Sequence, residues 1–463
     1  MAGEILAHQA VASNIDLLSA WIEAQIAYRG QPGLSIGLVY DQALVWAKGF
    51  GWADVARKVP ATPQTIYRIA SITKLFTSTA ILQLRDAGKL QLDDPVRRHL
   101  PWFKVQNRYP DAPPITIRHL LTHTAGLPRE APFPYWTDSN FPTRAQVREA
   151  LPQQETVFPP ETKWKYSNLA LTLAGEIVAA IADQPYPTYV RQHILNPLQL
   201  GDTFVETIDP DHLQLATGYG RRLPDGSRTL SPFTDGQGIT PAANMASTVE
   251  DLARFAIFQL ADDADHGRQI LRGSTRREMQ RVHWLAPDWQ TGRGLGFQIS
   301  RQGGKTYIGH GGALQGYRTA IQMSPDDKIS VIVLTNADDG NPLLYIEKAF
   351  QWVAPAILKA ASAEPEATRS NPAWEPYLGK YRNVWRDAQI LPLNGELVML
   401  DPSLPHPELD MSKLIPVGEH TFQIESDNGF GADGELVIFE LDDQNKVARV
   451  KVGENYAYPL AEW

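Results

Sequence analysis

The sequence contains no cysteine. This absence excludes disulfide bonds, a cysteine nucleophile, iron–sulfur clusters and cysteine-bound zinc. The sequence also lacks an apolar run of about 18 residues, the length that a helix needs to cross a bilayer. No Lys or Arg precedes Arg29, so the charged region that opens a secretory signal is missing, and we expect a cytoplasmic protein.

Basic side chains are outnumbered by acidic ones. The 43 Lys and Arg residues stand against 52 Asp and Glu residues, which gives a formal net charge of −9 at pH 7. A chain of this sign has no general attraction for nucleic acid or for an anionic membrane, so we expect neither as a partner. The 463 residues, of which 43% are hydrophobic, suffice for two or three domains with a large core.

Apolar periodicity predicts a mixed α+β fold in the larger part of the chain. Helices are expected over 14–29, with Asn14 as the N-cap, over 71–87, over 167–182 and near 342–360. Strands are expected over 34–40 and 43–46, as a hairpin, and over 294–300, 305–309, 318–323 and 328–334. Helices flanking an antiparallel sheet built from both ends of this stretch indicate a layered α+β domain.

The composition changes near residue 360. Residues 360–376 are rich in Ala, Glu and Pro, which is typical of a linker. Beyond them, Asn394-Gly395 lies between two apolar runs, which is a strong hairpin signal, and further short alternating strands follow. We therefore predict a first domain over 1–358, a linker over 359–376 and a small antiparallel sheet or barrel over 377–463.

Ser71 and Lys74 stand at the start of the second expected helix. Three residues apart on a helix, their side chains lie on one face, about one turn from each other. The helix N-terminus favours developing negative charge at the serine, and apolar neighbours favour the neutral form of the lysine. A neutral lysine can activate a serine hydroxyl as a nucleophile. Taken alone, the same residues also fit a serine N-cap followed by an exposed lysine.

Two further motifs follow in the chain. Tyr166-Ser167-Asn168 precedes the third expected helix, and His310-Gly311-Gly312-Ala313 lies in the strand-rich region. Together with Ser71-Ile72-Thr73-Lys74, this order resembles the three boxes of the penicillin-recognising serine hydrolases, SxxK, YxN and Lys/His/Trp-x-Gly. That group includes class C β-lactamases, D-aminopeptidases, low-molecular-weight DD-peptidases and esterases of the same fold. The segments 115–128, 163–179 and 243–255 are similar as well.

The resemblance covers roughly residues 15–355 and carries a fold with it. It implies an antiparallel sheet flanked by helices, with an all-helical subdomain. The C-terminal segment resembles, more generically, the lipocalin-like β-barrel that is appended to some members of the group. In such relatives the barrel restricts substrate shape or mediates assembly.

The resemblance also implies roles for the matched side chains. Ser71 would be the nucleophile, and Lys74 would help to deprotonate it. Tyr166 would serve as general base or would hand the proton to the leaving group. Asn168 would hold an amide or the acyl side chain of the substrate and orient Lys74, while also fitting an N-cap of the helix that follows.

The third box is expected to supply the rest of the site. The backbone N–H groups of Ser71 and Ala313 would form the oxyanion hole, and Gly312 would let the substrate approach the strand closely. Gly311, Gly312 and Ala313 are therefore expected to bind substrate, and His310 to join the catalytic set. Because class A and class C β-lactamases carry Lys at this place and a neutral histidine holds a carboxylate less firmly, His310 argues against efficient β-lactamase activity.

Three other positions need an interpretation. Glu161 follows Pro160 where relatives usually have glycine, which predicts a different turn if that glycine has a positive φ. His119 and His123 have the i, i+4 spacing of two zinc ligands, but no Glu lies between them. We interpret both histidines as structural.

These observations predict a serine hydrolase that works through an acyl-enzyme on Ser71. The leading hypothesis is a carboxylesterase for small acyl esters. A D-amino-acid amidase, D-aminopeptidase or DD-peptidase-like enzyme is the alternative that His310 favours, and a catalytically silent penicillin-binding or sensor protein is the alternative from another class. The expected partner is a small-molecule ester or amide; no cofactor and no metal ion are expected, and the oligomeric state is left open.

Overall fold

The computed structural model describes residues 2–206, 215–262, 269–362, 371–426 and 432–461. The chain forms two compact units, one of Pro32–Ile346 and one of Met1–Gln31 with Glu347–Trp463. The first 31 residues, which the sequence analysis places in the hydrolase domain, are thus grouped with the C-terminal part. Of the expected linker over 359–376, residues 363–370 lie outside the described residues, and both described ends are helical, in a helix that reaches Ser362 and a 3-10 helix over Pro372–Tyr377. None of the described helices is long and apolar enough to span a membrane.

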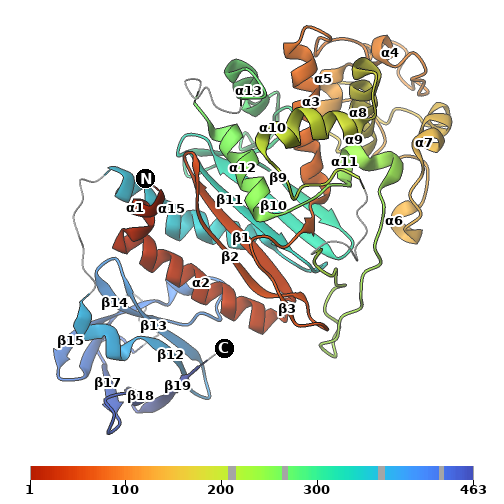
Figure 1. Cartoon of the computed structure of the whole chain (residues 1–463). Helices are drawn as coiled ribbons and strands as arrows, with labels where there is room; N and C mark the ends of the chain where they lie inside the picture. The colour runs from red at the N-terminus through yellow and green to blue at the C-terminus, as the bar shows by residue number, and fades with distance from the viewer. Residues whose placement is uncertain (1, 207–214, 263–268, 363–370, 427–431, 462–463) are drawn as a thin grey trace. The chain divides into compact units, whose positions relative to one another are not determined.

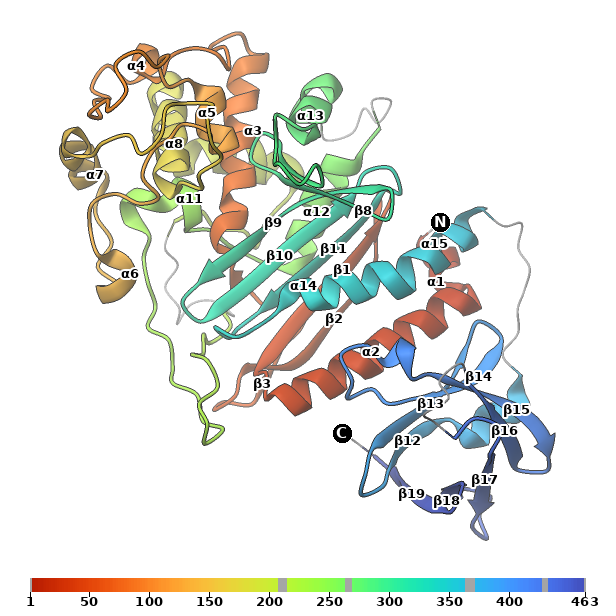
Figure 2. The ribbon, with the colours of Figure 1, turned by 180° about the vertical axis from the view of Figure 1, so that it is seen from behind.

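The unit Pro32–Ile346 is built around a nine-stranded antiparallel sheet (Figures 1 and 2). The strand order is β3-β2-β1-β11-β10-β9-β8-β7-β6. The bounds are β1 Gly33–Tyr40, β2 Ala43–Asp54, β3 Val59–Pro60, β6 Trp284–Leu285, β7 Thr291–Arg293, β8 Gln298–Gln302, β9 Lys305–Leu314, β10 Tyr317–Ser324 and β11 Ile329–Thr335. The expected hairpin β1–β2 is confirmed, and the apolar strand β11 is buried along its whole length at the centre of the sheet.

Helices of the same unit form one layer on the sheet and a separate helical region beside it (Figure 1). Helix α12 packs on β1, β2 and β11, while α3, α5, α8 and α11 pack against one another. The bounds are α3 Thr73–Asp86, α4 Val96–His99, α5 Ile117–Thr122, α6 Tyr135–Asp138, α7 Arg144–Ala150, α8 Asn168–Ala182, α9 Tyr186–Val190, α10 Asn196–Leu198, α11 Thr240–Ala243, α12 Val249–Leu260 and α13 Gly273–Gln280. Two short strands, β4 Tyr67–Arg68 and β5 Ala246–Ser247, pair outside the sheet. The expected α+β fold is confirmed.

The predicted position of one strand of this unit is wrong. The apolar run over 294–300 is not extended as a whole, and β8 begins only at Gln298. The Gly294 N–H donates to the Phe297 carbonyl, and Gly296 has a φ of +89°, so these residues form a turn. Strand β9, by contrast, is longer than expected, and its last five residues contain the third box.

The other unit contains helices from both ends of the chain and a closed eight-stranded barrel. Its first two helices are α1 Ala2–Ala7 and α2 Gln9–Arg29. A further helical run begins with the end of α14 Pro342–Lys348, continues through a π-helical turn Ala349–Val353 and ends with α15 Ala354–Ser362. The barrel consists of β12 Gly379–Arg382, β13 Asp387–Leu393, β14 Glu396–Leu400, β15 Ser412–Gly418, β16 Thr421–Glu425, β17 Leu436–Leu441, β18 Val447–Val452 and β19 Asn455–Leu460. Asn394 and Gly395 both have positive φ, +51° and +86°, which suits the tight turn between β13 and β14.

Within this unit, the helices and the barrel are joined by polar contacts. The Trp21 indole N–H donates to the Leu404 carbonyl at 2.9 Å. The Lys348 ammonium, which is fully buried, lies 2.7 Å from a carboxylate oxygen of Glu408. Asn14 is not the N-cap of α2, because the helix begins five residues earlier and the Asn14 side chain donates to Ala10 O within it.

Candidate active site

Ser71 lies in a short 3-10 turn, Ala70–Ile72, that leads directly into α3. Ala70 has a φ of +47°, a strained conformation for a residue with a side chain. The segment is held from both sides, because the Ile69 N–H donates to Met245 O at 2.9 Å and the Ile69 carbonyl accepts from the Thr319 hydroxyl at 3.2 Å. The turn therefore presents a half-buried Ser71 at the N-terminal end of α3.

Lys74 lies one turn further along, as its spacing predicts. Its Nζ is 3.0 Å from Ser71 Oγ, 2.8 Å from Asn168 Oδ1 and 2.7 Å from the Ala242 carbonyl oxygen. The side chain is fully buried, so it is not the exposed lysine of the alternative interpretation. Burial lowers the pKa of Lys74, and the nearby Tyr166 opposes this shift in part. The environment thus favours the neutral amine.

Tyr166 completes a triangle of polar atoms around the serine. Its hydroxyl donates to Ser71 Oγ at 2.9 Å, and Lys74 Nζ lies 4.9 Å from the centre of its ring. The His123 ring packs on the Tyr166 ring with centroids 4.5 Å apart, and the Arg129 guanidinium lies 4.9 Å from the centroid of the same ring. These contacts fix the phenol against Ser71. Sequence reasoning gave no indication of Arg129.

Asn168 is the first residue of α8, and the N-cap is its neighbour. The Ser167 hydroxyl accepts from the Ala170 N–H, so the expected N-cap role of Asn168 is wrong. The Asn168 amide instead bridges two ionisable side chains: Oδ1 accepts from Lys74, and Nδ2 donates to Glu130 Oε1 at 2.7 Å. No motif in the sequence pointed to Glu130.

His310 lies on β9 beside the same site and is 4% exposed. Its Nδ1 lies 2.6 Å from the Gly311 carbonyl oxygen. Because a carbonyl can only accept, Nδ1 carries the proton and Nε2 has the lone pair. Burial, together with the nearby Lys74, lowers the pKa of His310 to about 3. His310 is therefore neutral near pH 7 and brings no fixed positive charge to the third box.

Gly312 has a steric role in the packing of β9. A Cβ on this residue would lie 2.3 Å from the Ile69 carbonyl oxygen and 2.2 Å from the Thr319 hydroxyl oxygen. The missing side chain therefore lets β9 approach the segment before Ser71. At Gly311 the nearest atom to an added Cβ is 3.8 Å away, so that glycine has room for a side chain.

The three boxes line one cavity of about 690 Å³. Ser71, Tyr166, Asn168, His310, Gly311, Gly312 and Ala313 all lie in its wall, and Lys74 lies beneath them. Two indoles, Trp136 and Trp164, and two guanidinium groups, Arg129 and Arg318, also line it, and among the described residues no carboxylate side chain does. The structure thus brings every expected site residue to one place.

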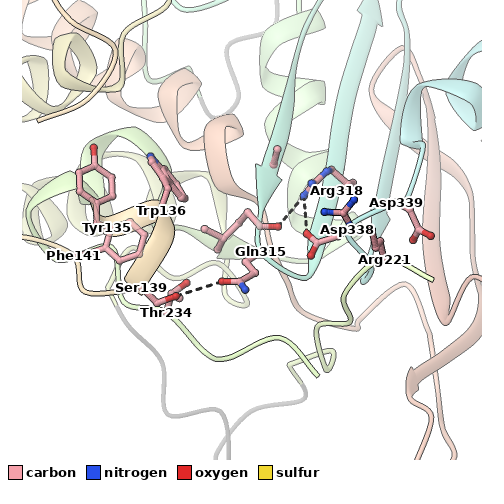
Figure 3. A pocket seen from close by; sticks show the side chains of 12 residues that line it. Tyr135, Trp136, Ser139, Phe141, Arg221, Thr234, Gln315, Arg318, Asp338 and Asp339 are labelled. Carbon is pink, nitrogen blue, oxygen red and sulfur yellow. Dashed lines mark hydrogen bonds and ion pairs between the residues drawn. The ribbon is translucent and has the colours of Figure 1, made fainter. Parts of the chain in front are cut away.

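A second groove of about 620 Å³ continues from this cavity, because Trp136, Ala313 and Arg318 line both. Figure 3 shows aromatic rings along one side of the groove and charged groups along the other. Trp136 packs against Phe141 with ring centroids 5.2 Å apart. Opposite them, the Arg318 guanidinium pairs with Asp338 at 3.1 Å. This groove offers room for a substrate group that extends beyond Ala313.

His119 and His123 form separate hydrogen bonds rather than a common site. His119 Nδ1 accepts from a backbone N–H, and its Nε2 lies 3.1 Å from Glu161 Oε1. His123 Nδ1 accepts from the Ser167 N–H. Glu161 itself adopts a φ of +63°, the left-handed conformation that glycine favours, so the expected change of turn is wrong. The His119 contact holds this glutamate in place.

The fold and the site define a class of protein, and comparison with known proteins agrees. A family model described as Beta-lactamase matches residues 18–354, and the chain belongs to this family. The chain is 30% identical to Beta-lactamase-like protein 2 of Dictyostelium discoideum over 342 residues, which are 71% of this chain and 61% of that protein. It is also 30% identical to Protein flp of Staphylococcus aureus (strain MW2) over 310 residues, 66% of this chain and 59% of that protein. The chain therefore spans about three fifths of the length of these relatives.

Solved structures show the same fold. An octameric penicillin-binding protein homologue from Pyrococcus abyssi matches 96% of this chain and 99% of its own, with a TM-score of 0.65 and 24% identity. A D-stereospecific amidohydrolase from Streptomyces sp. matches 72% of this chain and 97% of its own, with a TM-score of 0.60 and 25% identity. EstCE1, a hydrolase with promiscuous acyltransferase activity, matches 76% of this chain and 100% of its own, with a TM-score of 0.61 and 24% identity.

Proposed function

We propose that this protein is a serine hydrolase that cleaves small acyl esters through an acyl-enzyme on Ser71. The observation that carries the proposal is the triangle of Ser71 Oγ, Lys74 Nζ and the Tyr166 hydroxyl, with sides of 3.0 and 2.9 Å at the serine. A serine hydroxyl is a weak nucleophile unless a base lies within hydrogen-bond reach, and here a buried amine does. The Beta-lactamase family and its hydrolase neighbours support the same class.

The partners of Lys74 indicate how it would act as the base. Asn168 Oδ1 and the Ala242 carbonyl can only accept hydrogen bonds. A neutral amine donates its two N–H groups to these two oxygens, so its lone pair is left facing Ser71 Oγ. The serine proton passes to Lys74 as Oγ bonds to the substrate carbonyl carbon. The N–H groups of Ser71 and Ala313 stabilise the resulting oxyanion.

Tyr166 would return the proton to the leaving group. When the tetrahedral intermediate collapses, the bond between the carbonyl carbon and the alcohol oxygen breaks, and that oxygen takes the Tyr166 proton. Lys74 then reprotonates the phenol. A water molecule that replaces the departed alcohol is activated by the same groups in reverse and releases the acid from Ser71. The leaving group therefore lies on the Tyr166 side, and the groove beyond Ala313 takes the acyl group.

A D-amino-acid amidase, D-aminopeptidase or DD-peptidase-like activity is the second candidate. The similarity to a D-stereospecific amidohydrolase and the histidine in the third box favour it. We propose esters as the preferred substrate class because an ester needs less activation of its leaving group than an amide does. The neutral His310 provides no cation for a substrate carboxylate at that point.

A parallel screen of the purified protein separates these candidates. The probes are p-nitrophenyl acetate, butyrate and octanoate beside the p-nitroanilides of D-alanine and L-alanine. We expect kcat/KM for the acetate or butyrate ester to exceed that for either anilide at least about tenfold. A preference for the D-anilide would establish the amidase instead, and no turnover of any probe would favour a silent binding protein.

Two variants test the assignment of the nucleophile and its base. Ser71→Ala and Lys74→Met should each abolish ester turnover. Intact-protein mass spectrometry with a fluorophosphonate should show one adduct on the wild type and none on Ser71→Ala. Retained turnover by a folded Ser71→Ala protein would refute the nucleophile.

A further inference from the structure

Glu130 lies next to the catalytic triangle without touching its serine. Its Oε1 accepts from Asn168 Nδ2 at 2.7 Å, and its Oε2 accepts from the Tyr135 hydroxyl. The Arg129 guanidinium lies 3.2 Å from Oε1. A chain of polar contacts therefore runs from Glu130 through Asn168 and Lys74 to Ser71.

The backbone around Glu130 is fastened to the start of α8. The Ser167 hydroxyl donates to the Pro128 carbonyl at 2.6 Å, and the Asn168 N–H donates to the Arg129 carbonyl at 2.8 Å. The Gln154 side chain donates to the Glu130 carbonyl at 2.8 Å. The carboxylate is thus held opposite the Asn168 amide by contacts on both sides.

We propose that Glu130 is a positioning residue that fixes the orientation of the Asn168 amide and so keeps Lys74 directed at Ser71. This inference rests on the proposed function. An asparagine amide has nearly the same shape in its two orientations, so only its partners decide which end faces Lys74. The Glu130 carboxylate accepts and cannot donate, which requires Nδ2 on its side and leaves Oδ1 for Lys74.

The orientation matters when Lys74 acts as the base, because its neutral form has a single lone pair. If the amide turned round, Asn168 Nδ2 would face Lys74 Nζ and would offer a hydrogen to that lone pair. The lone pair would then be directed away from Ser71 Oγ, and the serine would lose its base. Without Glu130 we therefore expect a slower chemical step with little change in substrate affinity.

The charge of Glu130 also acts on Lys74. The carboxylate raises the pKa of Lys74, against the larger effect of burial, while Arg129 lowers it. The other titratable groups that face this lysine are Tyr166, from the loop before α8, His123, from the end of α5, and His310, from β9. Removing the negative charge alone should lower the pKa of Lys74 further, so the acidic limb of kcat/KM should move to lower pH.

Two variants of Glu130 separate orientation from charge. In Glu130→Gln the amide oxygen can still accept from Asn168, and its NH2 can donate to the Tyr135 oxygen, so the orientation survives without the charge. We expect a plateau kcat within about threefold of the wild type and an acidic limb at lower pH. In Glu130→Ala the plateau kcat should fall about tenfold to a hundredfold, with KM changed less than about threefold.

Glu176→Gln is the matched control, since this glutamate lies on α8, pairs with Arg144 at 2.6 Å and has no contact with the chain to Lys74. The assay is p-nitrophenyl acetate hydrolysis from pH 4 to 8, with urea unfolding to verify the fold. A merely structural Glu130 would lower the unfolding midpoint without moving the acidic limb. An unmoved limb in Glu130→Gln, or a wild-type plateau in Glu130→Ala, overturns the proposal.

Failure of the proposed function gives a different result. A wild type that hydrolyses no ester refutes that function while leaving Glu130 to be tested by the pH dependence of Ser71 labelling with a fluorophosphonate. In that assay too, the Glu130→Gln limb must move to lower pH and Glu130→Ala must label at least about tenfold more slowly. Equal labelling of all three proteins overturns the proposal.

Discussion

Replacing Gly312 with alanine would force β9 away from the segment that carries Ser71. The added Cβ would lie 2.3 Å from the Ile69 carbonyl oxygen, whereas non-bonded atoms approach to roughly 3.5 Å at rest. The Ile69 carbonyl is backbone two residues before the serine, so it cannot rotate away as a side chain would. We therefore expect the strand and the segment to separate by about 1 Å, which moves the Ala313 N–H relative to Ser71.

The size of the effect follows from the proposed role of that N–H as a donor in the oxyanion hole. A displacement of about 1 Å in a catalytic site, or the loss of one oxyanion donor, lowers kcat about 100-fold to 1,000-fold, or roughly 3–4 kcal/mol in activation free energy. The free energy of unfolding should fall by about 1–3 kcal/mol, as for other overpacked sites. The assay is kcat for p-nitrophenyl acetate beside urea unfolding at the same pH.

Two comparisons make this prediction refutable. Gly311→Ala adds the same methyl group one residue earlier, where the nearest atom is 3.8 Å away, and should change the free energy of unfolding by less than about 0.5 kcal/mol. Adding Thr319→Ala to Gly312→Ala removes the hydroxyl oxygen at 2.2 Å but not the Ile69 carbonyl, so it should not restore activity. A folded Gly312→Ala protein with wild-type kcat would refute the reasoning, as would rescue by the second substitution.

Three further predictions follow from other parts of the structure. Millimolar penicillin should give an adduct on Ser71 that intact-protein mass spectrometry detects. The adduct should form slowly because the neutral His310 supplies no cation for the carboxylate of the antibiotic, and it should last because the leaving amine stays tethered where water must enter. Fast loss of the antibiotic would contradict this prediction. Folding lowers the pKa values of His310 and His123, so below about pH 6.5 the unfolded chain binds protons that the folded chain does not bind. Each histidine should therefore reduce the free energy of unfolding by at most about 1.4 kcal/mol per pH unit as the pH falls. For His310 this loss continues down to its folded-state pKa of about 3. In His310→Asn the free energy of unfolding, measured with urea, should depend less on pH between pH 7 and 5. An unchanged pH dependence would contradict the lowered pKa of His310. Glu408→Ala should lower the free energy of unfolding by roughly 2–4 kcal/mol, because it leaves the buried Lys348 ammonium without its carboxylate; a loss below about 0.5 kcal/mol would show that the pair contributes little.

Local patterns in the sequence were sufficient for much of the fold and for the identity of the candidate site. The alternation around Asn394-Gly395 predicted a hairpin that the structure forms with the expected positive φ values. The three-residue spacing of Ser71 and Lys74 predicted side chains on one face, and their polar atoms lie 3.0 Å apart. Such features are determined by neighbours within one or two turns, so the sequence carries them directly.

Errors arose where a local signal competed with distant contacts. Asn14 has the residue type of an N-cap, but α2 begins at Gln9, and the Asn14 amide donates to Ala10 O within the helix and to the distant Asn394 Oδ1 at 3.3 Å. Of the two candidates for the cap of α8, Ser167 holds the position, and this frees Asn168 to bridge Lys74 and Glu130. Neither choice follows from residue type alone.

The sequence by itself determined the class of the protein, the order of its three boxes and the three residues, Ser71, Lys74 and Tyr166, that meet in the candidate site. Only the tertiary structure decided how those residues are supported. Glu130 reaches Asn168 across 38 residues, and Gly312 meets Ile69 across more than 240, through contacts that no periodicity or spacing encodes. The physical reason is that the pKa of Lys74 and the placement of Ser71 depend on burial and on partners brought together by packing, whereas a sequence pattern reports only the neighbours along the chain.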